Sequence, residues 1–252
     1  MKKILKIFID DIIYFVNFYL KNNKQQQNNR ILSSLVVLLL LSILGTFINV
    51  LGALFLGAID YQKPFFTNEI IQTINLHENM YIIVIPCIFA PIFEELGYRL
   101  PQKKSFINLF IAILSFIIAI KFISQSKVVL LLNGNFIEII KSINLYDWRL
   151  IPFLFILLKI LFQKLFKNRT KFDEDAIDYS IIIVTSIFFA LAHNQFPFTL
   201  HNSPWIIFAI IPYFFHGLYY SFIYNKFGIK RAILIHIIWN TIFIVPSALF
   251  NI

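Results

Sequence analysis

Two adjacent carboxylates, Glu94 and Glu95, end an otherwise apolar stretch, and Arg99 follows in the run APIFEELGYRLPQ. If this run is helical, Glu95 and Arg99 stand at positions i and i+4 on one face, within reach of an ion pair. Glu94 is then rotated by about 100° around the helix, away from that pair. The spacing predicts that Arg99 neutralises Glu95 and that Glu94 is left available as a general base. The alternative is that all three side chains lie at a helix end and reach out to water.

Two histidine motifs occur on later apolar stretches. Phe189 and His193 stand at i and i+4 in FALAH, and His236 and Asn240 stand at i and i+4 in HIIWN. An imidazole and an amide therefore project from one face of the last apolar stretch. A single histidine in such a helix is more often an interhelical hydrogen bonder than a reactive group. Together with a carboxylate that takes a proton from water, imidazole and amide groups that hold the water or an oxyanion indicate hydrolysis.

A zinc site is the alternative for the same side chains. Glu94, His193 and His236 are three ligands of types that zinc accepts, and a catalytic zinc ion keeps a fourth position open for water. The helix motif H-E-x-x-H of soluble zinc proteases is absent, because no second histidine follows His77 and Glu78 at the required position. The residues leave metal-free and zinc-dependent hydrolysis open.

The elements that must position these groups are membrane helices. Of the 252 residues, 59% are hydrophobic and 14% are charged, which excludes an ordinary soluble domain. The net charge of +9 fits basic loops facing anionic lipid, and no basic stripe on a polar domain indicates a nucleic-acid surface. We expect the lipid bilayer as a partner and no nucleic acid.

The fold class that we expect is all-α, a polytopic transmembrane helix bundle of about seven spans. Residues 1–30 are predicted to form an amphipathic, interfacial helix and a polar connector, not a cleaved signal peptide. Residues 31–252 are predicted to form a single transmembrane domain. The predicted spans are 31–59, 79–93 extended through the two glutamates as far as about Arg99, 105–120, 150–166, the two parts of 179–225 on either side of a break at 194–204, and 232–250.

The distribution of basic residues predicts a cytoplasmic N-terminus in the inner cell membrane. The loop after the first span carries Asp60, Glu69 and Glu78 against Lys63 alone. Basic residues concentrate on the cytoplasmic side of membrane proteins. Six of them precede the first span: Lys2, Lys3, Lys6, Lys21, Lys24 and Arg30.

The motifs EELGYR, FALAH and HIIWN, in this order on separate apolar stretches, resemble the CPBP family of membrane proteins. This family groups CAAX prenyl endopeptidases with bacterial relatives linked to bacteriocin processing and self-immunity. The resemblance covers a core of roughly residues 79–104 and 176–250. It implies an intramembrane endopeptidase that acts on a peptide or a membrane-associated protein, close to the cytoplasmic side.

The resemblance also implies roles for the motif residues. Glu94 would activate the water with assistance from His193, while His236 and Asn240 would stabilise the oxyanion. The second carboxylate and the arginine of the first motif would be structural or electrostatic supports. Members of the family are interpreted both as metalloproteases and as metal-free glutamate enzymes, so no cofactor is certain and zinc stays an alternative.

One departure from the family pattern is the distance between the first two motifs, because His193 follows Glu94 by 99 residues. Two extra spans are predicted in between, near 105–122 and 150–166. An even number of added crossings keeps the first and second motif helices antiparallel, so the apolar piece at 128–140 is predicted not to cross.

Two other classes of protein stay open from the sequence. A non-catalytic bacteriocin-immunity or scaffold protein would keep the polar cluster for packing. A transporter would use Glu94 and Glu95 as proton relays, although no inverted repeat is evident. In the stretch FFHGLYYSF, Gly217 is predicted to allow close helix packing, and His216 is predicted to form a packing or hydrogen-bonding contact.

Overall fold

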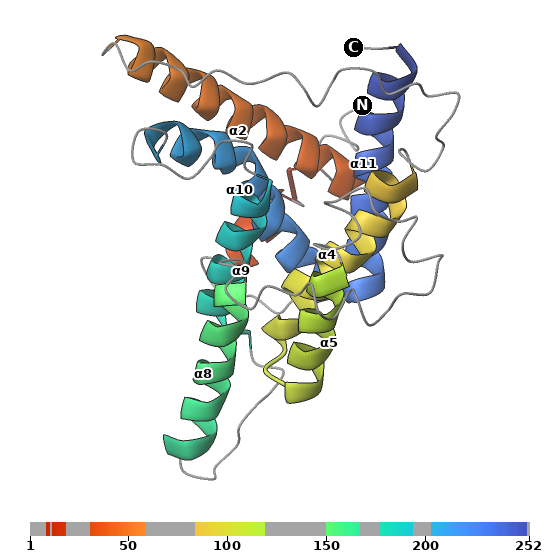
Figure 1. Cartoon of the computed structure of the whole chain (residues 1–252). Helices are drawn as coiled ribbons and strands as arrows, with labels where there is room; N and C mark the ends of the chain where they lie inside the picture. The colour runs from red at the N-terminus through yellow and green to blue at the C-terminus, as the bar shows by residue number, and fades with distance from the viewer. Residues whose placement is uncertain are drawn as a thin grey trace, which may run out of the picture. The chain divides into compact units, whose positions relative to one another are not determined.

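A computed structural model describes residues 9–10, 12–18, 31–58, 84–118, 150–166, 177–193 and 203–250, and its regular elements are all helical in these ranges (Figure 1). The all-α prediction is therefore confirmed for this part of the chain. The helices, with a π-helix η2 and a 3₁₀-helix η3, are α2 (Ile31–Ala58), η2 (Ile85–Phe89), α4 (Ala90–Arg99), η3 (Leu100–Gln102), α5 (Phe106–Ile118), α8 (Ile151–Phe166), α9 (Tyr179–Ala192), α10 (Ser203–Phe227) and α11 (Ile229–Phe250).

Three of these helices are long and apolar enough to cross a membrane: Ile31–Leu56, Pro204–Phe227 and Ile229–Pro246. The helices α5, α8 and α9 are apolar but shorter. The chain is thus a helical membrane protein, and the full set of seven crossings stays a prediction. The piece at 128–140 lies outside the described residues.

Helix boundaries follow local signals in the sequence. Pro204 lies in the first turn of α10, where its missing N–H costs nothing and its fixed φ suits the helix. Gly228, with φ of 84°, separates α10 from α11. A residue without a Cβ adopts this left-handed conformation without strain, so the position terminates a helix readily.

The helices belong to two compact units, which are described separately. The first unit takes residues 1–75 and 186–226, and the second takes residues 76–185 and 227–252. One boundary falls inside α9, between Thr185 and Ser186, and another falls at the end of α10, between Lys226 and Phe227. The expectation of a single transmembrane domain over 31–252 stays a prediction.

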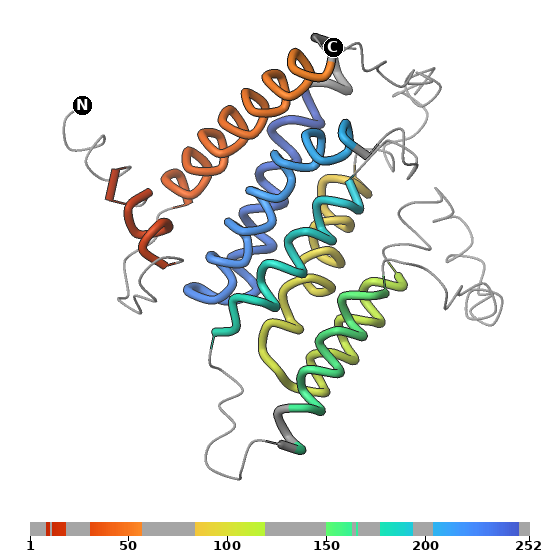
Figure 2. Tube along the Cα trace, turned by 90° about the vertical axis from the view of Figure 1, so that its left-hand side faces the viewer, coloured from red at the N-terminus to blue at the C-terminus, as the bar shows by residue number. Residues whose placement is uncertain are grey.

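In the first unit, glycines bring helix backbones close together. A Cβ at Gly45 of α2 would lie 2.6 Å from the Pro212 Cα atom of α10, and the two helices run side by side in Figure 2. A Cβ at Gly217 of α10 would lie 3.0 Å from the Ser186 Cα atom of α9. The predicted close approach at Gly217 is confirmed.

The N-terminal helical residues 12–18 also belong to the first unit. Tyr14 and Phe18 are buried, and each packs edge-on against Phe222 of α10, with ring centroids 5.6 Å and 5.3 Å apart. The Lys226 ammonium lies over both rings, 5.2 Å from the centroid of Tyr14 and 5.3 Å from that of Phe18. This segment packs on protein, and its interfacial location stays a prediction.

In the second unit, α4 is held by aromatic and polar contacts. The rings of Tyr98 and Phe116 meet edge to face at 5.4 Å, and Phe116 in turn contacts Phe153 of α8 at 5.0 Å. At the end of η3, the Gln102 amide donates to the Thr185 hydroxyl of α9 over 3.2 Å. These contacts fix the helix that carries the two glutamates.

A charged contact joins α8 to the start of α9. The Lys159 ammonium lies 2.7 Å from an oxygen of Asp178, and the same oxygen accepts from the Ser180 N–H over 3.1 Å. Burial raises the pKa of the Asp178 carboxyl, but the bonds from Lys159 and Ser180 outweigh this and hold its pKa below the ordinary value. Asp178 therefore caps α9 and pairs with the cation inside apolar α8.

Candidate active site

The first motif lies on a helical stretch that changes its winding along its length. The π-helix η2 runs into α4, which carries Glu94, Glu95 and Arg99, and η3 ends the stretch at Gln102. Single wide turns of the π type inside α-helices are frequent at functional sites. The polar motif thus directly follows an irregular turn inside an apolar helix.

Glu95 and Arg99 form the ion pair that their spacing predicts. The Arg99 Nε atom donates to the Glu95 Oε2 atom over 3.1 Å, and both side chains are completely buried in the second unit. Their burial argues against the alternative in which the side chains of this motif reach out to water. A buried pair of this kind persists when further hydrogen bonds satisfy its remaining polar atoms.

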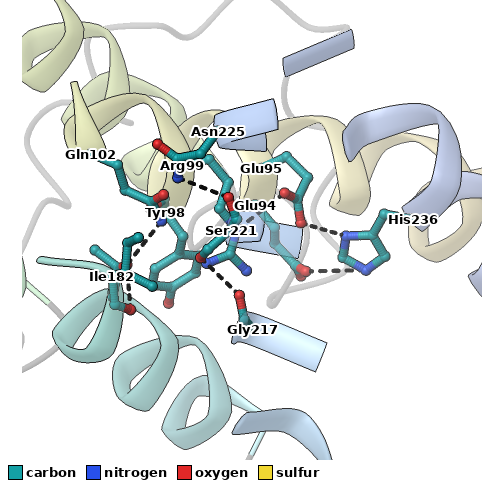
Figure 3. Close-up of polar contacts among 11 residues, drawn as sticks. Glu94, Glu95, Tyr98, Arg99, Gln102, Ile182, Gly217, Ser221, Asn225 and His236 are labelled. Carbon is teal, nitrogen blue, oxygen red and sulfur yellow. Dashed lines mark hydrogen bonds and ion pairs between the residues drawn. The ribbon is translucent and has the colours of Figure 1, made fainter. Parts of the chain in front are cut away.

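His236 of α11 supplies one of those further bonds. Its Nδ1 atom lies 2.9 Å from the Glu95 Oε1 atom, so the carboxylate binds Arg99 with one oxygen and the imidazole with the other (Figure 3). An ionised carboxylate only accepts hydrogen bonds, so the Nδ1 atom carries the proton and donates it to Glu95. The buried carboxylate therefore sets the tautomer and the orientation of the ring.

The other ring nitrogen faces the first glutamate. The His236 Nε2 atom lies 3.9 Å from the Glu94 Oε2 atom, and Figure 3 shows the Glu94 and Glu95 carboxylates directed to the two nitrogens of one ring. The side chain of Glu94 is 21% exposed, whereas that of Glu95 is fully buried. Of the two carboxylates, Glu94 is the more exposed one.

Asn240 lies one helical turn after His236 on α11. Its Nδ2 atom donates to the carbonyl oxygen of Pro86 in η2 over 2.9 Å. The two polar residues of the third motif thus both bind the helical stretch of the first motif, as α11 packs against η2 and α4. The oxyanion role of Asn240 stays a prediction.

His193 lies in the first unit, in the turn that follows α9. Its Nδ1 atom is 2.8 Å from the Phe189 carbonyl oxygen, and its ring stacks on Tyr213 with centroids 4.8 Å apart. These contacts fix the orientation of the imidazole within that unit. The assistance that His193 would give to Glu94 stays a prediction.

His216 forms the interhelical contact that was expected of it. Its Nε2 atom is hydrogen-bonded to the Ser42 hydroxyl of α2. Ser42 gives its single proton to the Leu38 carbonyl, 2.9 Å away, so the hydroxyl accepts from the histidine. A serine in this state is not activated as a nucleophile, and the contact is structural.

The described ranges contain no group of three or more His, Cys, Asp or Glu residues that could hold a metal ion. In the second unit, the Nδ1 atom of His236 and both oxygens of Glu95 are engaged by other side chains. The donors facing each other there are those of Glu94 and the Nε2 atom of His236, whereas a catalytic zinc site takes three protein ligands. Zinc stays a prediction for Glu94, His193 and His236 together, and no step below is routed through a metal.

Sequence reasoning did not identify the bond between His236 and Glu95 or the role of Pro86. Helical spacing finds partners within one helix, and these partners are 141 and 154 residues apart. The sequence did contain a signal for Pro86. Pro86 and Pro91 both interrupt the apolar run just before the glutamates, and a proline inside a helix removes a backbone N–H donor.

A family model described as "Type II CAAX prenyl endopeptidase Rce1-like" matches residues 76–242. The match spans all three motifs and also covers α5 and α8, which the sequence predicted to be extra helices. No curated protein and no solved structure is similar enough to this chain to count as a match.

Proposed function

Since the chain belongs to the Rce1-like family of type II CAAX prenyl endopeptidases, within the CPBP group, we propose that it is an intramembrane endopeptidase that uses glutamate-activated water. The family is one of proteases, and the long apolar helices make the chain a membrane protein. The observation that carries the proposal is the position of His236 between a buried, ion-paired carboxylate and an accessible one.

In the proposed reaction, Glu94 takes a proton from a water molecule that attacks the carbonyl carbon of the scissile peptide bond. The carbonyl oxygen becomes an oxyanion, which the Nε2–H of His236 stabilises while its Nδ1–H stays bonded to Glu95, so this step requires a ring that carries a proton on both nitrogens. Glu94 then returns its proton to the leaving amine, so that the enzyme ends in its initial state. His193 assists the water, as the family pattern implies.

Glu95 and Arg99 support this chemistry without contacting the substrate. Glu95 orients the His236 ring through its Nδ1 atom, while the Arg99 guanidinium binds the other oxygen of Glu95 and fixes that carboxylate in place. This arrangement places a fixed acceptor behind the histidine, as in other hydrolytic sites where a carboxylate orients an imidazole.

The substrate class that we propose is a peptide or a membrane-associated protein, cleaved near the cytoplasmic side of the inner cell membrane. A site on membrane helices suits a substrate that is itself held at the bilayer. The N-terminus of the chain is proposed to be cytoplasmic, in keeping with the basic residues before α2.

The test compares the termini of membrane proteins, by mass spectrometry, in cells that carry wild type or Glu94→Gln at matched expression. Gln is nearly isosteric with Glu but cannot act as a base. We expect new peptide termini with wild type and none with the variant. Identical termini in both strains would overturn the protease assignment and favour the non-catalytic immunity or scaffold alternative.

A matched pair of histidine variants tests the location of the site. His236→Ala is expected to remove cleavage, and His216→Ala is expected to keep most of it, because His216 bonds Ser42 of another helix. Equal activity in the two variants would contradict the assignment of His236. Metal analysis of purified wild type and of His236→Ala decides whether zinc is bound and whether its binding requires His236.

A further inference from the structure

The carbonyl of Pro86 lies where the backbone cannot supply a donor. In the π-helix η2, hydrogen bonds run from residue i+5 to residue i, and the Ala90 N–H donates to the Ile85 carbonyl. In the same register, the Pro86 carbonyl would accept from the N–H of residue 91. Residue 91 is a proline, which has no N–H. Ala90, the donor of an ordinary α-helical register, is already bound to Ile85.

The side-chain amide of Asn240, on α11, supplies the donor that the Pro86 carbonyl lacks. Its Nδ2 atom donates to the Pro86 oxygen over 2.9 Å. A half-buried carbonyl without a donor is costly, so a side chain that satisfies it stabilises the wide turn as well as the contact between the helices. The amide thus takes the role of the backbone N–H that Pro91 lacks.

This bond lies on the same faces as the candidate catalytic contacts. His236 and Asn240 are one turn apart on α11, and both bind the stretch from η2 to α4. Two contacts along one pair of helices fix both the rotation and the translation of α11, which a single contact would not. The bond at Pro86 therefore helps to set the gap of 3.9 Å between the His236 Nε2 atom and the Glu94 Oε2 atom.

We propose that Asn240 is a positioning residue, whose amide replaces the missing N–H of Pro91 at the Pro86 carbonyl and so aligns His236 with Glu94. The alignment matters for the proposed protease activity, on which this part of the inference rests. The competing hypothesis is that Asn240 contacts the oxyanion directly. In that case its effect on cleavage does not depend on Pro86 or Pro91.

The test is a double-mutant cycle between positions 240 and 91, measured on the purified full chain in detergent. Asn240→Ala removes the donor, and Pro91→Ala provides a new backbone N–H in the register of the Pro86 carbonyl. We expect Asn240→Ala to lower Tm by about 2 °C or more, as the loss of the donor to a half-buried carbonyl does. We expect Pro91→Ala to recover most of this loss in the double variant. Additive effects on Tm would overturn the proposal.

Peptide cleavage by wild type, the two single variants and the double variant separates a positioning role of Asn240 from oxyanion binding. Misplacement of a reacting group by about 1 Å lowers the rate roughly 100-fold, so Asn240→Ala is expected to lower kcat by up to that factor. If the amide positions the site, Pro91→Ala restores kcat together with Tm. Recovery of Tm without recovery of kcat would overturn the positioning role and leave the oxyanion account.

Two further variants keep the result interpretable. Asn240→Asp retains the shape of the side chain but places a carboxylate against the Pro86 carbonyl, and it is expected to be at least as damaging as Asn240→Ala. Asn225→Ala is the matched control, because the Asn225 amide bonds the Ser221 carbonyl of its own helix. The inference would be contradicted if Asn225→Ala had an effect as large as that of Asn240→Ala, or if Pro91→Ala rescued the effect of Asn225→Ala.

If wild type cleaves nothing, the proposed function fails, while the double-mutant cycle measured by Tm still decides whether the Asn240 amide replaces the missing N–H.

Discussion

At the scale of single residues, Glu95 is the centre of the polar cluster, although it is the carboxylate that water does not reach. One oxygen binds the Arg99 guanidinium and the other binds the His236 ring, and all three side chains are buried. A carboxylate in this position has two tasks: it compensates a buried cation and it selects the tautomer of the histidine. In the proposed reaction, the nearby Glu94 is the carboxylate that takes the proton from water.

Glu95→Gln is predicted to destabilise the protein as well as to inactivate it. The neutral amide leaves the Arg99 charge uncompensated in a buried site, which costs about 3–5 kcal/mol in comparable cases. We expect lower abundance in the membrane and a lower Tm in detergent. Glu94→Gln is the control, since it changes a partly exposed carboxylate that lies outside this ion pair. Unchanged Tm and abundance in Glu95→Gln would show that the pair contributes nothing to folding.

The composition of this cluster could be predicted from the sequence only in part. The ion pair of Glu95 with Arg99 was predictable because both residues lie on one helix at a known spacing. The bond of His236 to Glu95 was not, because a motif gives the face on which a side chain lies and not the helix that it meets. The family resemblance assigned His236 to the oxyanion, with zinc binding as the alternative, whereas the structure ties its Nδ1 atom to the ion pair.

At the scale of helices, apolar runs and their breaks predicted most boundaries. The run at 31–59 became α2, and the break at 194–204 separates α9 from α10. The predicted last span, 232–250, starts three residues earlier as α11 because Gly228 ends the preceding helix. The wide turn η2 was not predicted, since a change of hydrogen-bond register leaves no mark on hydrophobicity.

Helix packing predicts opposite outcomes for two glycine substitutions. In Gly45→Ala, the new Cβ would lie 2.6 Å from the backbone of Pro212, so α2 and α10 must move apart. Overpacking of this kind costs about 1–3 kcal/mol, and we expect a lower Tm. In Gly97→Ala, the Cβ meets Phe116 at an ordinary 3.5 Å. The gain in helix propensity, up to about 1 kcal/mol, is expected to leave Tm equal or higher. The reverse order of the two Tm values would contradict the helix packing described for each site.

At the scale of the whole molecule, the proposed orientation can be tested with single cysteines in a Cys87→Ala background. Lys63→Cys is expected to react with a membrane-impermeant maleimide in intact spheroplasts, because the loop after α2 is predicted to lie outside. Lys230→Cys, at an exposed position, is expected to react only after permeabilisation. The reverse labelling pattern would show that the chain has the opposite orientation in the membrane. The test matters because four basic residues would lie outside under this scheme: Lys121, Lys127, Lys141 and Arg149.

The contact between Lys159 and Asp178 has a consequence for biogenesis. A lysine at the centre of a bilayer costs about 2.5–3.5 kcal/mol on the scale measured for insertion by the translocon. The Lys159 ammonium acquires its partner only when Asp178, farther along the chain, has been synthesised. If α8 crosses the membrane, as the sequence predicts, we expect the nascent helix to stay at the translocon until Asp178 and α9 follow, so that the two helices enter the lipid together as a hairpin.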